Sequence, residues 1–461
     1  MNTASTEPSS ILSRKAFGSM PQACVEKRND EVCARSTKQK HIIHVPRRFV
    51  AEEWGGTETV VLETCRQQQL AGSNPVIFTS MALAKLPRET VQGVPVRRFG
   101  YTYPFFGLTS EQKNALDKKG GNLFSLSMLT ALLREKDVRL FHAHALKRLG
   151  GTVRTAARLR KKPFVVSLHG GVFDVPDSEI KMMRKPIEGK FEWGRPLGAL
   201  LGSRRVLEDA DMVLCVGASE CDKALVELSH DRIAHLPNGV DFARFQRGDG
   251  ASFRATHGIS PNTFLVLNIS RIGSQKNQML LLQAFSKLVA KKKDSHLVLI
   301  GPVTVPECAA KLRDYIEEKN LHANVSILPG MKSDNPQLID AYHACDVFVL
   351  PSIHEPFGIV VLEAWSARKP VIVSNVGGLR RLVRADETAL MIDPFSNEAG
   401  DDLNAKLTLI AENPALGARL GQAGQNEARS CYDWSRIALR QEELYQQAEE
   451  NAAKRYGRAA R

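Results

Sequence analysis

Short apolar runs alternate with stretches of helical periodicity from residue 41 onward, and this alternation limits the possible folds more than any other feature of the chain. Such alternation favours a parallel sheet that is covered by helices on both faces. Helices are expected at Thr57–Leu70, Asn122–Leu133 and Leu149–Arg160. The strands expected in the first half are His41–Val45, Pro75–Thr79, Val94–Phe99, Arg139–His144, Phe164–His169, Met212–Gly217 and Ile233–Leu236.

The alternation stops at Pro237-Asn238-Gly239-Val240-Asp241 and then begins again. A chain of 461 residues is too long for one ordinary core, so two doubly wound, Rossmann-like domains facing a central cleft are predicted. The predicted boundaries are 41–243 and 244–425, followed by a helical C-terminal segment with a basic tail at 426–461. The strands expected in the second half are Phe264–Ser270, Leu297–Gly301, Val325–Leu328, Val347–Leu350, Val371–Ser374 and Ala389–Ile392.

Composition narrows the class of protein. No apolar stretch approaches the ~20 residues that span a bilayer. Residues 1–40 are polar and lack the apolar core of a secretory signal, so they are predicted to form a disordered extension. The 8 cysteines show no metal-ligand spacing, which favours inert thiols in a reducing cytoplasm over a zinc site.

The net charge of +13 is concentrated in a few places. One basic stretch holds only Glu188 and Glu192 as acids, and a second closes the chain. No RNA-binding motif or stripe of interleaved aromatic residues is present, so nucleic acid is not an expected partner. Peripheral contact with an anionic membrane surface and a merely solvated basic face remain as alternatives. The basic residues are Lys181, Arg184, Lys185, Lys190, Arg195, Arg204 and Arg205, with Lys454, Arg455, Arg458 and Arg461 in the tail.

Two glutamates follow the apolar run that ends at Leu350. Glu355 is expected on a loop at the carboxyl end of a strand, and Glu363 about one turn inside the helix that Phe357-Gly358 opens. Ligands bind at that edge of an open parallel sheet. Two carboxylates so placed could hold two ends of a polyhydroxylated ligand, although solvated surface glutamates are an alternative.

Two cations follow the first strand of the second half. Arg271 comes directly after that strand, and Lys276 stands where the next helix is expected to begin. Side-chain charge, free amide groups and the helix dipole together make an anion site that suits a diphosphate, although a solvated arginine and lysine that merely flank a helix are an alternative.

Paired glycines punctuate both halves. Gly55-Gly56 precedes the first helix without a dinucleotide or P-loop pattern, and Gly377-Gly378 holds the equivalent place in the second half. Both pairs would let backbone approach a phosphate or sugar closely, although a plain loop is an alternative for Gly55-Gly56. His169-Gly170-Gly171 ends a strand and is expected to point into the same cleft, although a histidine satisfied within the structure is an alternative.

Other polar residues are given ordinary roles. His142 and His144 flank Ala143 and are interpreted as normal strand alternation, and Asn238-Gly239 is interpreted as the turn between the domains. The aromatic run 101–106 is expected to pack against the core rather than line an acceptor groove or lie on a membrane.

Together these residues resemble the retaining glycosyltransferases of the GT-B fold, specifically family 4 (group 1). The resemblance covers roughly residues 41–450. It rests on Glu355-Pro-Phe-Gly-Ile-Val-Val-Leu-Glu363, on Arg271 and Lys276 in SRIGSQKN, on His169-Gly170, on the Pro-Asn-Gly-Val-Asp linker and on Gly55-Gly56. One position departs: Arg381 stands where the family usually carries Glu, three residues after the second glycine of the Gly377-Gly378 loop.

The resemblance implies transfer of a sugar from a nucleotide diphosphate donor with retention of configuration and without a metal or other cofactor. Arg271 and Lys276 would stabilise the leaving diphosphate. Glu363 would accept hydrogen bonds from the ribose, while Glu355 and His169 would hold and orient the transferred sugar. The residues implied around the donor are Gly55, Gly56, Arg271, Lys276, Glu355, Phe357, Gly358, Glu363, Gly377 and Gly378.

Two alternatives stay open from the sequence. A nucleotide-sugar epimerase has a similar two-domain shape, and a non-catalytic homologue could bind a glycan or a partner. For a transferase, the expected acceptor is a glycan or a lipid-linked molecule, recognised by the loops at 100–120 and 172–198.

Overall fold

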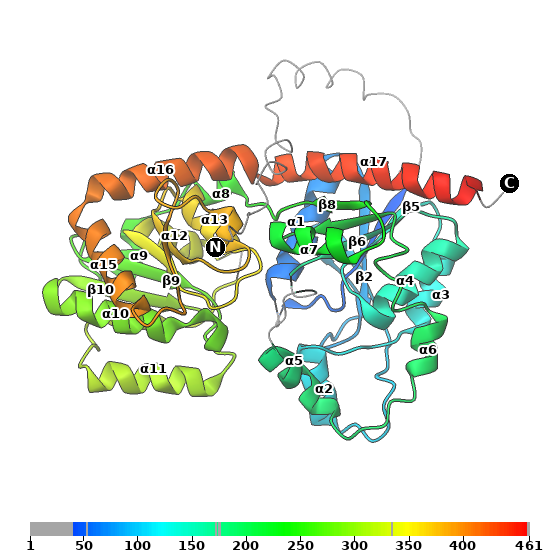
Figure 1. The fold of residues 1–461 in the computed structure, drawn as a ribbon, viewed down its shortest axis with the longest axis horizontal. Helices are drawn as coiled ribbons and strands as arrows, with labels where there is room; N and C mark the ends of the chain where they lie inside the picture. Colours follow the sequence, from blue (N-terminus) through cyan, green and yellow to red (C-terminus); the bar gives the residue numbers. More distant parts are fainter. Residues whose placement is uncertain (1–39, 52–53, 171–172, 174–176, 333–334, 459–461) are drawn as a thin grey trace, which may run out of the picture. The chain divides into compact units, whose positions relative to one another are not determined.

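The computed structural model describes residues 40–51, 54–170, 173, 177–332 and 335–458, which form two sheets with helices around them (Figure 1). The first sheet is ordered β3-β4-β2-β1-β5-β6-β7-β8 and is parallel except for β3, which runs antiparallel to β4. Its strands are β1 His41–Val45, β2 Asn74–Ser80, β3 Arg88–Val91, β4 Val94–Phe99, β5 Val138–Ala143, β6 Phe164–Leu168, β7 Met212–Cys215 and β8 Ile233–His235.

The second sheet is ordered β11-β10-β9-β12-β13-β14, and all its pairings are parallel. β12 is buried along its whole length, as strands covered on both faces must be. The strands are β9 Phe264–Ile269, β10 Ser295–Ile300, β11 Val325–Leu328, β12 Val347–Leu350, β13 Val371–Ser374 and β14 Leu390–Ile392.

Helices connect the strands in both halves. Those of the first half are α1 Gly56–Leu70, α2 Ser110–Lys118, α3 Leu126–Arg134, α4 Lys147–Leu159, α5 Asp177–Arg184, α6 Arg195–Leu200 and α7 Ala218–Glu227. Those that follow are α8 Phe242–Phe245, α9 Gly250–Thr256, α10 Gln278–Lys291, α11 Pro306–Glu318, α12 Pro336–Ala344, α13 Ile359–Ser366, α14 Leu379–Leu382, α15 Ala399–Glu412, α16 Pro414–Cys431 and α17 Trp434–Arg458. None of the helices described is both long and apolar enough to cross a membrane.

The C-terminal segment divides between the two sheets. α16 packs against α13 of the second half, whereas α17 packs against the first sheet. Trp434, Leu444 and Tyr445 of α17 share one buried cluster with Ile42 and Leu214. The two halves are therefore linked twice, once through the chain around Val240 and once through α17.

Two differences from the sequence expectations have local causes. The hairpin strand β3 was not expected because its residues alternate between exposed and half-buried, and the turn Gln92-Gly93 that joins it to β4 has φ values of 46° and 85°. The helix expected from Asn122 begins only at Leu126, because Phe124 pairs with Thr102 and the Ser125 hydroxyl caps the helix. α2 was also not expected. The extension predicted at 1–40 lies outside the described residues except for Lys40.

Candidate functional site

An ion pair joins the loops that follow β9 and β12. Lys276 ends a short 3₁₀ turn, Ser274–Lys276, and its Nζ lies 2.5 Å from Oε2 of Glu355. The Ile353 amide donates to the Gln275 carbonyl at 2.9 Å, which ties the same two loops together through the backbone. The structure thus brings together the predicted cation and carboxylate, 79 positions apart in the chain, at the carboxyl edge of the second sheet.

The Gly377-Gly378 loop packs directly on the loop of Glu355. The Gly378 amide donates to the Glu355 carbonyl at 2.8 Å. A Cβ on Gly377 would lie 2.4 Å from that carbonyl oxygen, and one on Gly378 would lie 2.0 Å from the Pro356 oxygen. Both glycines are therefore required for this backbone contact, which holds Glu355 in place.

Phe357 and Gly358, both predicted to contact the ligand, lie at the start of α13 and have different roles there. Gly358 caps the helix with φ 99°, a backbone conformation that glycine adopts most readily. The Phe357 side chain is buried in the core of the second half, 6.2 Å from the Tyr432 ring, so only its backbone is left to meet a ligand.

Glu363 lies inside α13, as predicted. Its Oε2 accepts a hydrogen bond of 2.6 Å from the buried Tyr342 hydroxyl. Burial raises the pKa of the Glu363 carboxyl, while the Tyr342 hydrogen bond and the charge of Arg244 act in the opposite direction. The Tyr342 hydroxyl thus helps to hold the carboxylate in one orientation through Oε2, and Oε1 has lone pairs for a further hydrogen bond.

Arg271 is exposed at the carboxyl end of β9. Its carbonyl accepts from the Gln278 side chain at 3.0 Å, which fixes the backbone at the start of α10. Within the described ranges no carboxylate pairs with its guanidinium, so its charge is available to an anion at this edge.

The first half contributes two glycine loops. Gly55 caps α1, and a Cβ on Gly56 would meet no atom of the described residues within 4 Å. Gly170 has φ 84°, and its Cβ would lie 2.2 Å from Cβ of Pro356. The His169-Gly170 loop therefore touches the loop of Glu355, while Gly171 lies outside the described residues.

A cavity of about 310 Å³ opens beside His169. Its wall includes Arg47, Thr57, Asn122, Lys147 and the glycines 120 and 121, all from the first half. The Arg47 guanidinium donates to the carbonyls of residues 116 and 117, which are neutral groups. Burial and the neighbouring charges of Arg184 and Arg47 lower the pKa of Lys147.

Arg381, the position that departs from the family pattern, is exposed and bonds to Asp222 in the middle of α7, 3.2 Å away. It therefore makes a contact with the first half in this structure. The aromatic run is split: Tyr101, Tyr103 and Phe105 pack on the first core, as expected, whereas Phe106 is 62% exposed and stacks on Phe191.

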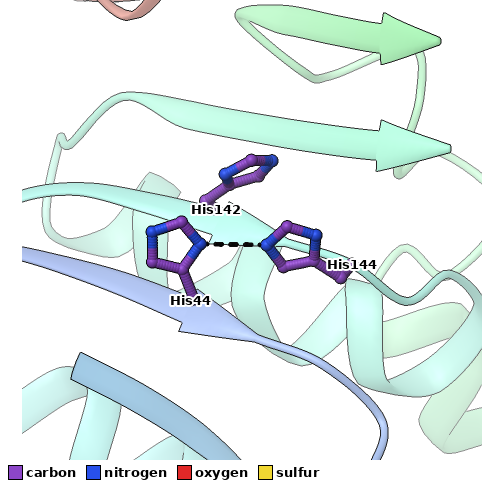
Figure 2. A group of neighbouring side chains, drawn as sticks. All are labelled: His44, His142 and His144. Atoms are coloured by element: carbon purple, nitrogen blue, oxygen red, sulfur yellow. Dashed lines mark hydrogen bonds between the residues drawn. The ribbon is translucent and has the colours of Figure 1, made fainter. Parts of the chain in front are cut away.

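Sequence reasoning missed a cluster formed by His44, His142 and His144 (Figure 2). His44 pairs with His142 in the register of β1 and β5, and that parallel register was the available signal. The interpretation of His142 and His144 as ordinary alternation was incomplete, because both faces of this sheet are covered. Ring nitrogens of the three lie within 4.8 Å of one another, a grouping that could suit a metal. Every one of those nitrogens, however, already has a hydrogen-bond partner in the protein.

Comparison with known proteins agrees with this geometry. The model of the glycosyltransferase family 4 matches residues 54–244, and the model of the glycosyl transferases group 1 matches residues 250–427. D-inositol 3-phosphate glycosyltransferase from Rhodococcus jostii is 28% identical over 415 residues, covering 86% of this chain and 85% of its own. The enzyme of the same name from Pseudarthrobacter chlorophenolicus is 30% identical over 252 residues, covering 54% and 58%.

Solved structures show the same fold. HepE from Anabaena, crystallised with UDP and glucose, superposes with a TM-score of 0.64 at 18% identity and covers 88% of this chain and 99% of its own. Sucrose-phosphate synthase from Thermosynechococcus elongatus reaches 0.67 at 20% identity, covering 89% and 99%. The family models and the curated relatives favour a glycosyltransferase over an epimerase or a binding homologue. The chain belongs to the group 1 glycosyltransferases and has the GT-B fold.

Proposed function

We propose that the protein transfers a sugar from a nucleotide diphosphate sugar to an acceptor hydroxyl, with retention of configuration and without a metal ion. The observation that carries the proposal is the Lys276–Glu355 pair at the sheet edge, in contact through Pro356 with the His169-Gly170 loop. The cation proposed for the leaving group and the carboxylate proposed for the sugar are adjacent. Crystals of HepE with UDP and with UDP-glucose support a nucleotide-sugar donor.

Leaving-group departure is the step that these cations would assist. Negative charge grows on the diphosphate as the glycosidic bond breaks, and preorganised donors stabilise such charge most effectively where water is excluded. Arg271 would supply a full positive charge. Lys276 would transfer its hydrogen bond from Glu355 to a phosphate oxygen, which would free Glu355 to accept from hydroxyls of the sugar.

The remaining donor contacts follow from the groups left available. The free carboxylate oxygen of Glu363 would accept from the ribose hydroxyls. Backbone amides at Phe357, Gly358 and Gly56 would meet phosphate or sugar oxygens. His169 would orient the transferred sugar at the reacting bond.

The cavity beside His169 supports an acceptor that carries a phosphate. Arg47 and Lys147 line it, and Lys147 has φ 58°, a strained backbone conformation of the kind that clusters at functional sites. A phosphorylated polyol, as named for the relatives, and a lipid-linked phosphate share this chemistry. We expect Lys147→Ala to raise the KM for the acceptor at least about tenfold and to leave donor hydrolysis unchanged. If Lys147→Ala and the wild type had the same KM for a phosphorylated acceptor, the assignment of this cavity to the acceptor phosphate would be contradicted.

Calorimetric titration with UDP, GDP, ADP and their sugar conjugates tests the donor site. We expect one nucleotide to bind equally with and without Mg²⁺ and to lose affinity in Glu363→Ala. Lys276→Ala and Arg271→Ala should lower turnover by about tens- to a thousand-fold, as expected for loss of a transition-state donor. Near-normal turnover in both variants would overturn the proposed roles, and product stereochemistry decides retention.

A further inference from the structure

Histidine side chains run in a hydrogen-bonded line from the interior to the cavity. His169 Nε2 lies 2.9 Å from His144 Nδ1, and His144 Nε2 lies 3.0 Å from His44 Nδ1. His44 Nε2 lies 2.9 Å from Oε1 of Gln68, on α1. Figure 2 shows the middle contact, between His44 and His144. His144 and His169 line the cavity, whereas Gln68 is buried at the far end of the line.

The same glutamine starts a second line that returns to the cavity. Nε2 of Gln68 donates to the Tyr445 hydroxyl at 3.1 Å, and that hydroxyl lies 2.8 Å from Nδ1 of His142. His142 Nε2 lies 2.7 Å from Oγ of Ser167, which lines the cavity two positions before His169 on β6. One chain of hydrogen bonds thus begins and ends at neighbouring points of one cavity wall.

The polarity of the first line follows from the Gln68 amide oxygen. That oxygen only accepts, so His44 carries its proton on Nε2 and accepts on Nδ1. The same reasoning applied to His144 and then to His169 leaves a proton on Nε2 of each ring. Nδ1 of His169 is then an acceptor, and it is buried without a partner among the described residues. Burial lowers the pKa of His44 and of His169 to about 4, which keeps both rings neutral.

The polarity of the second line is the reverse. The Tyr445 hydroxyl accepts from Gln68 and therefore donates to His142 Nδ1, so His142 donates from Nε2 to Ser167. The Ser167 hydroxyl is left to donate its own proton. The two ends of the chain are thus a donor and an acceptor, and a substrate hydroxyl, which both accepts and donates, complements such a pair.

We propose that Gln68 and Tyr445 are positioning residues that fix the histidine tautomers, so that Ser167 and His169 together bind a hydroxyl group in the cavity. The hydroxyl belongs to a sugar or polyol, an identity that rests on the proposed function. It lies either on the transferred sugar or on the acceptor.

Histidine tautomers are measured by two-bond ¹H–¹⁵N spectra of protein labelled at histidine, with assignments from single histidine variants. At pH 7 we expect the wild-type rings of His44, His142, His144 and His169 to be protonated on Nε2. A proton on Nδ1 of His169 would overturn the proposal. This result requires no substrate, so it stands even if the transferase activity fails.

Two variants separate the lines. Gln68→Met should leave both lines with mixed tautomers, while Tyr445→Phe should release His142 and leave His44, His144 and His169 protonated on Nε2. Gln69→Met is the matched control, since the Gln69 amide donates to the Gly93 carbonyl and takes no part in the hydrogen-bonded histidine network. Should Gln68→Met fail to fold, Tyr445→Phe still decides, because a merely structural role would not change the tautomer of one line alone.

Kinetics with the nucleotide sugar found by calorimetry locate the hydroxyl. If it lies on the transferred sugar, Ser167→Ala should lower kcat/KM for donor hydrolysis about tenfold, the size expected for one hydrogen bond. If it lies on the acceptor, hydrolysis should stay constant while kcat/KM for transfer falls. Unchanged hydrolysis and transfer in both Ser167→Ala and Tyr445→Phe would overturn the role of the pair.

Discussion

The ion pair of Lys276 and Glu355 couples stability to catalysis at the scale of single residues. Their side chains are only 16% and 11% exposed, so each charge depends on the other. Removing one partner of such a pair leaves an uncompensated charge, at a cost of about 3–5 kcal/mol for fully buried pairs and less here. Turnover of Lys276→Ala is therefore best compared with that of Arg271→Ala, whose exposed side chain has little role in folding.

The buried histidines predict how stability depends on pH. Burial lowers the pKa of His44 from 6.5 to about 4. Below pH 6.5 the unfolded chain binds a proton there that the folded chain does not, so stability is fully present above about 6.5 and is lost as pH falls toward 4. The change for His44 amounts to about 3 kcal/mol. The free energy of unfolding, measured by urea titration at pH values between 7.5 and 4.5, should fall less steeply with decreasing pH in His44→Gln than in the wild type.

The exposed His322 provides the control for that measurement. Its side chain is 62% exposed and its ion pair with Glu317 lies at the surface, where such pairs contribute little to stability, so the stability of His322→Gln should fall with pH as steeply as that of the wild type. If the free energy of unfolding fell equally steeply with pH in all three proteins, the lowered pKa of His44 would be contradicted.

Individual residues differ in how far their sequence reveals their role. Lys276 and Glu355 could be predicted together, because each follows a strand and parallel strands end at one edge. Phe357 could not, since its position in the motif does not say whether the ring faces the ligand or the core. The histidine chain was missed because it depends on register between β1 and β5 and on Tyr445, about 300 residues further along.

At the scale of elements, the site depends on loops that touch through backbone. Gly170 and Gly378 both pack against Pro356. A Cβ added to Gly217 would lie 3.1 Å from the oxygen of the same proline. The glycine pair at 377 and 378 was expected to approach a ligand. Its contacts show a second requirement, which is close packing against the loop that carries Glu355.

Gly170→Ala tests this packing, with Gly258→Ala as its matched control. Both glycines have positive φ, 84° and 66°, but a Cβ on Gly258 would meet nothing within 4 Å. Gly258→Ala should cost about 1–2 kcal/mol of stability from backbone strain alone. Gly170→Ala should add about 1–3 kcal/mol of overpacking and lower kcat/KM. Urea unfolding and steady-state kinetics compare the two, and equal effects would contradict a role for the Pro356 contact.

At the scale of the whole molecule, alternation and the interruption near residue 240 were sufficient to predict two doubly wound sheets. The destination of α17 could not be predicted, because a helix pattern shows which face is apolar but not which surface covers it. Arg139 on β5 bonds to Glu442 and Glu449, and Arg455 bonds to Asp211, so charged pairs also fix α17 on the first sheet.

Substitution of two leucines in α17 tests how much this packing contributes to the free energy of unfolding. Leu444 is 1% exposed in the cluster with the first sheet, whereas Leu439 on the same helix is 70% exposed. Leu444→Ala should lower the free energy of unfolding by about 2–5 kcal/mol. Leu439→Ala should stay within about 0.5 kcal/mol of the wild type. Urea titration of both variants decides, and a small loss in Leu444→Ala would mean that the first sheet is stable without α17.

The return of α17 to the first sheet has a consequence for biosynthesis. The strands of the first sheet are synthesised early. The apolar face formed by Ile42, Leu140, Val165 and Leu214, however, is not covered by α17 until residues 434–448 have been synthesised. The second half can complete its own core around β9–β14 before that point. The half of the protein that is translated first is therefore the half that finishes folding last, and its uncovered face is exposed to chaperones and to aggregation throughout translation.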